Sequence, residues 1–193
     1  MTEPTVLIVP GLRGAMAQHW QTLLAARLPR VRSVAPIGPE NLDCAARVAA
    51  VEREAQAIEG PLVIVAHSAG CIIVAHWALQ TKRAVHGALL ATPPDFQSPI
   101  PESYTTIKAL RDTGWLPVPR SRLPFRSIVA ASRNDPLGRF KRVATLAFDW
   151  GAKLVDVGKV GHLNLASGHG EWPQAEDFIA QLSALQPIAG APP

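Results

Sequence analysis

The segment PLVIVAHSAGCIIVAHWAL (residues 61–79) decides the fold, because two apolar runs meet there at a polar pair, His67 and Ser68. The first run, LVIV, has the β-branched composition of a buried strand. The second run, CIIVAHWAL, has the length and apolar character of a buried helix. The sequence AHSAG (66–70) is therefore left as a very tight turn from strand to helix.

A turn of this kind is the nucleophile elbow of the α/β-hydrolase fold. It holds a serine in a strained backbone conformation, so the hydroxyl of Ser68 is expected to project above the sheet. The N–H groups at the start of the following helix face the same point. Small residues are needed where strand and helix cross closely; Gly70 meets this need, and Ala66 replaces the more usual glycine. The alternative is that Ser68 is only a helix N-cap.

The rest of the chain alternates short β-rich runs with segments of helical period. The predicted strands are bounded by Gly or Pro and comprise residues 5–10, 32–37, 61–66, 85–91, 126–131 and 153–158. Several are apolar at consecutive positions, which indicates a parallel sheet buried on both faces. Helical stripes begin at Trp20, Ala45 and Phe178, and Pro173 suits the first turn of the last helix. This order predicts an α/β protein with a compact α/β-hydrolase fold, a mostly parallel sheet of about six strands with helices on both faces.

A length of 193 residues predicts one domain, residues 1–186, followed by a loose C-terminal tail at 187–193. The alternation breaks at residues 92–124, which are rich in proline and contain one short helical piece around 103–111. A connection of this length between strands usually has a function of its own. We predict that it forms an irregular, lid-like insertion.

A serine hydroxyl is a weak nucleophile, so Ser68 needs a base and an acid that orients the base. The expected chain order in this fold is serine, acid, histidine. Asp135 in SRNDPL follows the strand predicted at 126–131, and His162 in KVGHLN follows the last predicted strand. Both lie in loops at the carboxyl ends of strands. The sequence therefore predicts Ser68, Asp135 and His162 as a catalytic triad.

Other residues compete for these roles. Asp149 and Asp156 are disfavoured as the acid because they would lie inside a helix and a strand, and His169 lies further from the strand end than His162 does. His67 is expected on the far side of the elbow, in a packing or hydrogen-bonding role. Asp135 precedes a proline, so it is also predicted to cap a helix that has Pro136 in its first turn.

The oxyanion hole of this fold combines two backbone N–H groups. One belongs to the residue after the nucleophile, Ala69, and the other to the loop after the first strand, VPGLRG, where Leu12 is the expected donor. The alternative is that the glycines of this loop only make a turn. The apolar candidates for substrate binding are Trp20, Phe96, Tyr104, Trp115 and Leu116.

Composition argues against several function classes. The formal net charge is +4, and nine basic side chains lie between residues 108 and 142, which we interpret as a solvated basic face and not as a nucleic-acid site. The two cysteines, Cys44 and Cys71, lie in helical or apolar patterns, which favours buried thiols in a reducing compartment. The amino end does not resemble a signal peptide, and no segment reaches the roughly 18 apolar residues of a membrane span. We expect a cytoplasmic protein with no nucleic-acid or membrane partner and with neither metal nor organic cofactor.

The motifs together resemble those of the small serine hydrolases grouped with retinoblastoma-binding protein 9. The matching motifs are VLIVPG at the start, HW at His19 and Trp20, VAHSAGC at the elbow, SRNDP at the acid and GHLN at the base. The resemblance extends from Thr5 to about Leu182. It implies a compact sheet without the first strands of larger enzymes, the triad named above, and a lining or supporting role for His19 and Trp20.

One departure limits what the resemblance implies. The animal member binds a pocket protein through a Leu-x-Cys-x-Glu motif, and the nearest stretch here, LDCAA (42–46), has Ala46 where the glutamate belongs. That partner is therefore not expected.

The triad predicts a serine hydrolase that cleaves a small ester through an acyl-enzyme, with a small-molecule acyl substrate. An amidase or thioesterase would use the same three residues. A non-catalytic binding protein on the same fold is the alternative from another class. A dehalogenase is disfavoured because it would carry a carboxylate at position 68.

Overall fold

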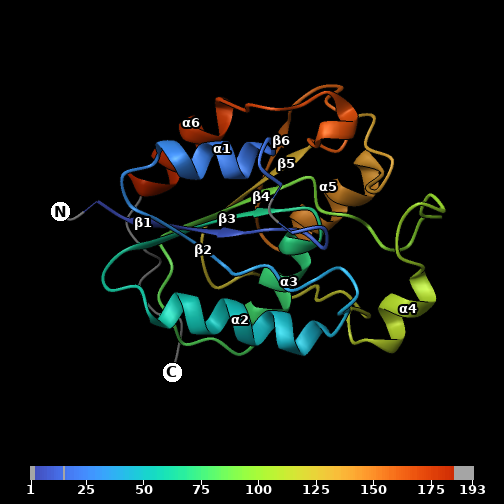
Figure 1. Ribbon diagram of the computed structural model, residues 1–193, viewed down its shortest axis with the longest axis horizontal. Helices are drawn as coiled ribbons and strands as arrows, with labels where there is room; N and C mark the ends of the chain where they lie inside the picture. Colours follow the sequence, from blue (N-terminus) through green and yellow to red (C-terminus); the bar gives the residue numbers. More distant parts are fainter. Residues whose placement is uncertain (1–2, 15, 185–193) are drawn as a thin grey trace.

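Six parallel strands form a single sheet in the order β2-β1-β3-β4-β5-β6 (Figure 1). The computed structural model describes residues 3–14 and 16–184, so the tail expected at 187–193 lies outside the described residues. The prediction of a six-stranded parallel sheet is confirmed. The strands are β1 (Thr5–Val9), β2 (Val31–Ser33), β3 (Leu62–His67), β4 (Gly87–Ala91), β5 (Ser127–Ala131) and β6 (Lys153–Asp156).

Helices cover both faces of the sheet, as predicted (Figure 1). One face carries α1 (Trp20–Arg27) and α6 (Gln174–Ser183), and the other carries α2 (Cys44–Gln56), α3 (Ala69–Ala78) and α5 (Phe140–Asp149). Pro173 has helical dihedral angles immediately before α6, close to its expected place. No helix within residues 3–14 and 16–184 combines the length and apolar character that a membrane span requires.

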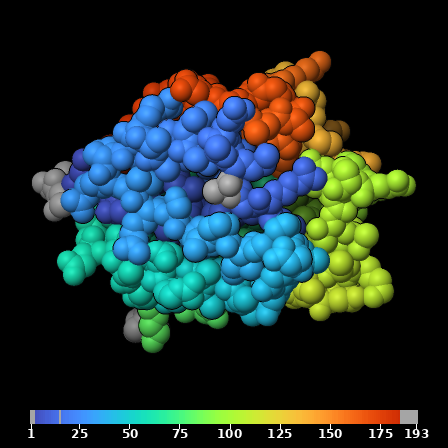
Figure 2. Space-filling model, viewed as in Figure 1, coloured from blue at the N-terminus to red at the C-terminus, as the bar shows by residue number. Residues whose placement is uncertain are grey.

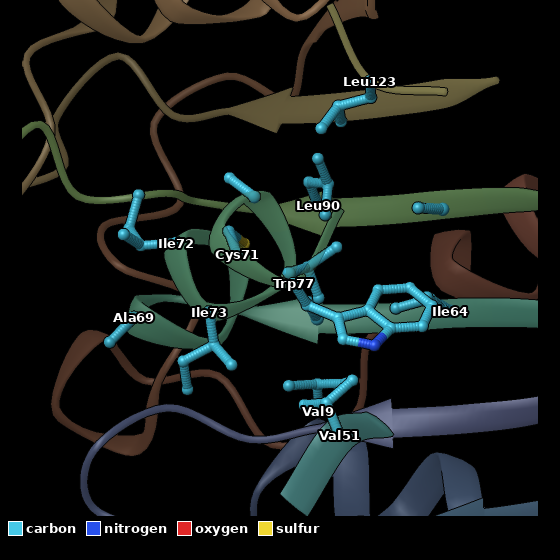
Figure 3. Packing of buried hydrophobic residues seen from close by; sticks show 14 of the residues in the cluster. Val9, Val51, Ile64, Ala69, Cys71, Ile72, Ile73, Trp77, Leu90 and Leu123 are labelled. Atoms are coloured by element: carbon cyan, nitrogen blue, oxygen red, sulfur yellow. The ribbon is translucent and has the colours of Figure 1, made fainter. Parts of the chain in front are cut away.

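The central strand β3 shows why consecutive apolar residues predicted a parallel sheet. Val63, Ile64 and Val65 are fully buried, and they alternate between the two faces. Ile64 packs with Trp77 of α3 and with neighbouring residues of the cluster shown in Figure 3. Val63 and Val65 pack on the opposite face with α1 and α6. Both sides of the strand therefore exclude water.

The second strand is shorter than predicted. Residues 32–37 were expected to be extended throughout, but β2 ends at Ser33. Val34 still donates its N–H to the carbonyl of Ile8 at 2.9 Å. Pro36 has no N–H to continue the ladder, and β2 is an edge strand that no further strand supports.

The insertion at 92–124 contains one short helix, α4 (Ile107–Asp112), beside a segment without regular structure. The helix begins where it does because the side chain of Thr106 accepts a hydrogen bond from the N–H of Ala109. The insertion is attached to the start of α2, where Trp115 Nε1 donates to the carbonyl of Leu42 at 2.7 Å. Figure 2 shows it, in yellow-green, against the blue β1–α1 loop.

The topology places a crevice at the carboxyl ends of β1 and β3. From β1 the chain moves to β2 on one side, whereas from β3 it moves to β4 on the other. The connections therefore leave the sheet in opposite directions between these strands, and open α/β sheets bind ligands at such a point. The loop after β1 and the turn after β3 flank it.

Candidate active site

Ser68 occupies the turn between β3 and α3 with φ 56° and ψ −130°, a conformation that residues other than glycine rarely adopt. Its N–H donates to the carbonyl of Ala91 at 3.0 Å, and its carbonyl accepts from Cys71 at 2.9 Å. The side chain makes no capping hydrogen bond to α3, although Ser68 occupies the N-cap position. The hydroxyl is therefore free for another partner, and the N-cap alternative does not describe it.

Gly70 makes this turn possible because it lies against the end of β1. A Cβ atom at position 70 would lie 2.5 Å from the carbonyl oxygen of Val9 and 2.8 Å from that of Pro10. Both distances are below van der Waals contact, and both atoms belong to the backbone. The need for a small residue two positions after the serine, which the sequence predicted, has this close approach as its cause.

We expect Gly70→Ala to lower the free energy of unfolding by about 3 kcal/mol through overpacking. The sign is informative, because alanine ordinarily stabilises a helix relative to glycine by about 1 kcal/mol. Urea denaturation of both proteins measures the difference. The matched control is Gly170→Ala, whose Cβ would meet nothing closer than the carbonyl oxygen of Gln18 at 3.9 Å. Equal stability of the Gly70 variant and the wild type would contradict the close approach.

His162 joins Ser68 to Asp135. Its Nε2 lies 2.8 Å from Ser68 Oγ, and its Nδ1 lies 2.9 Å from each carboxylate oxygen of Asp135. The side chains of His162 and Asp135 are almost completely buried. The structure thus brings together the three residues that the sequence predicted, although they lie in loops after three different strands.

The competing residues lie elsewhere. Asp149 and Asp156 form ion pairs with Arg120 and Arg133. His169 makes a backbone hydrogen bond to Asn164 and does not line the cavity described below.

The backbone of His162 is held from both sides. Its N–H donates to Ser167 Oγ at 2.9 Å, and its carbonyl accepts from His67 Nε2 at 2.8 Å. The flanking residues Gly161 and Leu163 both have positive φ angles, 59° and 48°, so the loop is a tight one. Sequence reasoning missed Ser167, and its place five residues after the predicted base was the only signal for it.

His67 and His19 stay neutral beside His162. Burial lowers the pKa of His67 well below its ordinary value, and the nearby His162 and His19 lower it further. Burial, together with His162, lowers the pKa of His19 to about 4. Because a carbonyl can only accept, His67 carries its proton on Nε2. The supporting role predicted for His67 agrees with this hydrogen bond.

Asp135 does not cap a helix as expected. Its Oδ1 accepts from the N–H of Leu137 at 2.8 Å, which is a local turn, and α5 begins only at Phe140. Between Asp135 and α5 the chain passes against the insertion at Gly138, where an added Cβ would lie 2.7 Å from the carbonyl oxygen of Pro93.

The amides predicted for the oxyanion hole lie beside the serine. Leu12 and Ala69 both line the cavity that contains Ser68. A Cβ at Gly11 would lie 3.1 Å from Ser68 Cβ and 3.5 Å from its Oγ, so the β1–α1 loop passes directly against the serine. Among the described residues, neither the N–H of Leu12 nor that of Ala69 has a hydrogen-bond acceptor. Both amides are therefore available to a bound oxygen atom.

Comparison with known proteins identifies the family. The model of a family described as serine hydrolase matches residues 6–181. The chain belongs to this serine hydrolase family. No curated protein matched it.

Solved structures share the fold of this serine hydrolase. A protein described as a YdeN-like hydrolase from Pectobacterium atrosepticum has 28% identity and a TM-score of 0.79, over 94% of this chain and 91% of that one. The ydeN gene product of B. subtilis has 19% identity and a TM-score of 0.73, over 93% and 98%. Est1E from Butyrivibrio proteoclasticus has 10% identity and a TM-score of 0.68, over 94% and 88%. The α/β-hydrolase fold is confirmed.

The serine hydrolase has a cavity of about 370 Å³ around Ser68, with the insertion forming part of its wall. Phe96 and Tyr104 of the insertion line it, as predicted. The apolar lining residues that the sequence analysis missed include Met16, Ile100, Leu110, Leu137 and Leu165. Ile100 and Leu110 belong to the predicted insertion, which was the available signal. The described residues hold no cluster of three or more His, Cys, Asp or Glu side chains suited to a metal ion.

Three of the five predicted binding residues do not line the cavity. Trp20 is 1% exposed and packs in the core against Trp172, with ring centroids 4.9 Å apart. Trp115 is fully buried behind Phe96, where its indole N–H has the Leu42 carbonyl as acceptor. Leu116 packs against the core on the α2 and α3 face. His19, by contrast, lines the cavity.

Proposed function

We propose that this protein is an esterase that hydrolyses small carboxylic esters through an acyl-enzyme on Ser68. The observation that carries the proposal is the continuous hydrogen-bonded chain from Ser68 Oγ through His162 to Asp135, beside two amides without acceptors. A nucleophile, a base, an orienting acid and an oxyanion site are the parts that acyl transfer needs.

In the first half-reaction, His162 Nε2 takes the proton of Ser68 as Oγ bonds to the ester carbonyl carbon. The N–H groups of Leu12 and Ala69 donate to the oxyanion. His162 then gives its proton to the departing alkoxide, which leaves as the alcohol. Asp135 accepts a hydrogen bond from Nδ1–H throughout, which leaves Nε2 of the neutral imidazole unprotonated at the start and stabilises the imidazolium that forms.

In the second half-reaction, water replaces the alcohol. His162 takes one of its protons, the hydroxide bonds to the acyl carbon, and Ser68 leaves as it regains the proton. The product is a carboxylic acid, and the enzyme returns to its starting state. The cavity is mostly apolar, which suits an acyl group, and its volume of about 370 Å³ is near the low end for ligand pockets, which is our reason to propose an esterase of small substrates.

A fluorophosphonate probe tests the proposal, because it reacts only with an activated serine. We expect one covalent adduct, which mass spectrometry of the digested protein assigns to the peptide containing Ser68. Labelling should be lost in His162→Ala, because that variant has no base to accept the serine proton. 4-Nitrophenyl esters of increasing acyl length then define the preferred chain. Absence of an adduct on folded protein would favour the non-catalytic binding role.

A further inference from the structure

Arg13 gives the cavity a feature that ester hydrolysis by itself does not need. Among the described residues that line the cavity, Arg13 has the only side chain with a permanent charge, and no Asp, Glu or Lys accompanies it. It directly follows Leu12, the proposed oxyanion donor. A positive charge therefore lies one residue along the chain from the point where the substrate carbonyl would bind.

Two contacts hold the guanidinium of Arg13. Its Nη2 donates to the carbonyl of Ser103 at 3.1 Å, and its Cζ lies 4.6 Å from the centroid of the Tyr104 ring. Stacking on an aromatic face fixes the plane of a guanidinium while leaving its edge available. The side chain is thus held in place although it is exposed at the cavity opening.

The guanidinium has unused hydrogen-bonding capacity. It carries five N–H donors, and within the described residues only one of its nitrogens has a protein acceptor. Within the described residues, no carboxylate of Asp or Glu forms an ion pair with Arg13, although such pairs form at Arg27, Arg32, Arg120 and Arg133 and at no other arginine. A planar cation held at a cavity opening without a counter-ion suits a bidentate carboxylate.

We propose that Arg13 binds a carboxylate on the substrate, so that the preferred substrates are short-chain esters whose leaving group carries a negative charge. The inference rests on the proposed esterase activity. The apolar side chains of the cavity accommodate the acyl group, and the leaving group extends toward the opening, where Arg13 lies. The formal net charge of +4 further favours the approach of an anion.

The test compares two acetate esters of similar shape, 4-acetoxybenzoate and the neutral 4-acetoxybenzamide. We measure kcat/KM for each ester in the wild type, in Arg13→Met and in Arg13→Lys. For each protein we then take the ratio of kcat/KM for the anionic ester to kcat/KM for the neutral ester. Because all the proteins are assayed with the same two esters, differences in the intrinsic reactivity of the esters cancel. The matched control is Arg111→Met, which removes an equal charge from an exposed position of the insertion that does not line the cavity.

We expect Arg13→Met to lower the anionic-to-neutral ratio by about 10- to 100-fold, the range for a lost charge-assisted hydrogen bond, mainly through KM. The ratio for Arg13→Lys should lie between those of the wild type and Arg13→Met, since lysine keeps the charge but lacks the planar guanidinium. Arg111→Met should leave the ratio as in the wild type. Added salt should weaken only the preference of proteins that retain Arg13 or its charge.

An unchanged ratio of anionic to neutral kcat/KM in Arg13→Met overturns the proposal. If kcat/KM falls equally with both esters, the ratio is also unchanged, and Arg13 then only holds the insertion in place. Fluorophosphonate labelling of Ser68 separates these results from a failure of the proposed function. If the wild type is labelled and cleaves the neutral ester, only the role of Arg13 is at stake. If it is neither labelled nor active on either ester, both proposals fall.

Discussion

Ser68→Ala is expected to reduce kcat for a 4-nitrophenyl ester by on the order of 10⁶-fold, the loss seen when a triad serine is removed. The variant lacks the only oxygen that His162 Nε2 contacts within the described residues, at 2.8 Å in the wild type. It should fold normally, because the side chain of Ser68 makes no capping bond to α3. Steady-state kinetics with an active-site titration of the wild type measure the loss.

The control for this variant is Ser121→Ala, an exposed serine outside the cavity. It should keep wild-type kcat and KM. Thermal unfolding of both variants shows whether the fold is retained. Turnover by a folded Ser68→Ala variant comparable to that of the wild type would mean that the observed hydrolysis does not use the proposed nucleophile.

Asp135→Asn is expected to lower kcat by on the order of 10⁴-fold with little change in KM. Oδ1 of Asp135 accepts from the N–H of Leu137 at 2.8 Å, so the asparagine oxygen should take that place. The amide nitrogen would then lie where Oδ2 is, 2.9 Å from His162 Nδ1, and would donate to it. The imidazole proton would move to Nε2, and a protonated Nε2 cannot accept the proton of Ser68.

The matched control is Asp149→Asn, which tests the acid that competed with Asp135 in the sequence. Asp149 pairs with Arg120 at 2.8 Å and does not contact His162. Its loss should change stability by less than about 1 kcal/mol, as for an exposed pair, and should leave kcat unchanged. If Asp149→Asn reduced kcat and Asp135→Asn did not, the assignment of the acid would be wrong.

Much of the fold and of the candidate site could be predicted because parallel strands share one property. Their carboxyl ends lie at the same edge of the sheet, so loops that follow different strands come close together. Identifying Ser68, Asp135 and His162 required only strand positions and residue types. The elbow could be recognised from a local pattern of residue types, whereas the approach of Gly70 to the end of β1 joins α3 to a neighbouring strand that is distant in sequence.

The cavity wall could not be predicted in the same way. Trp20, Trp115 and Leu116 are as apolar as Phe96, yet they belong to the core, because hydrophobicity alone does not distinguish a packed interior from the wall of a pocket. Whether such a side chain lies in the core or lines the cavity depends on the residues it contacts. Trp20 meets Trp172, and Trp115 donates to Leu42, and both partners are distant in sequence.

The sequence by itself determined the parallel sheet, the elbow and the order of serine, acid and histidine, because these depend on local patterns and on the direction of the strands. Only the tertiary structure decided which side chains surround Ser68 and where charge is placed near it. The contact of Arg13 with Tyr104 and the hydrogen bond from His67 to the carbonyl of His162 both join residues more than 90 positions apart. Such contacts depend on how the finished layers pack, and no local pattern encodes them.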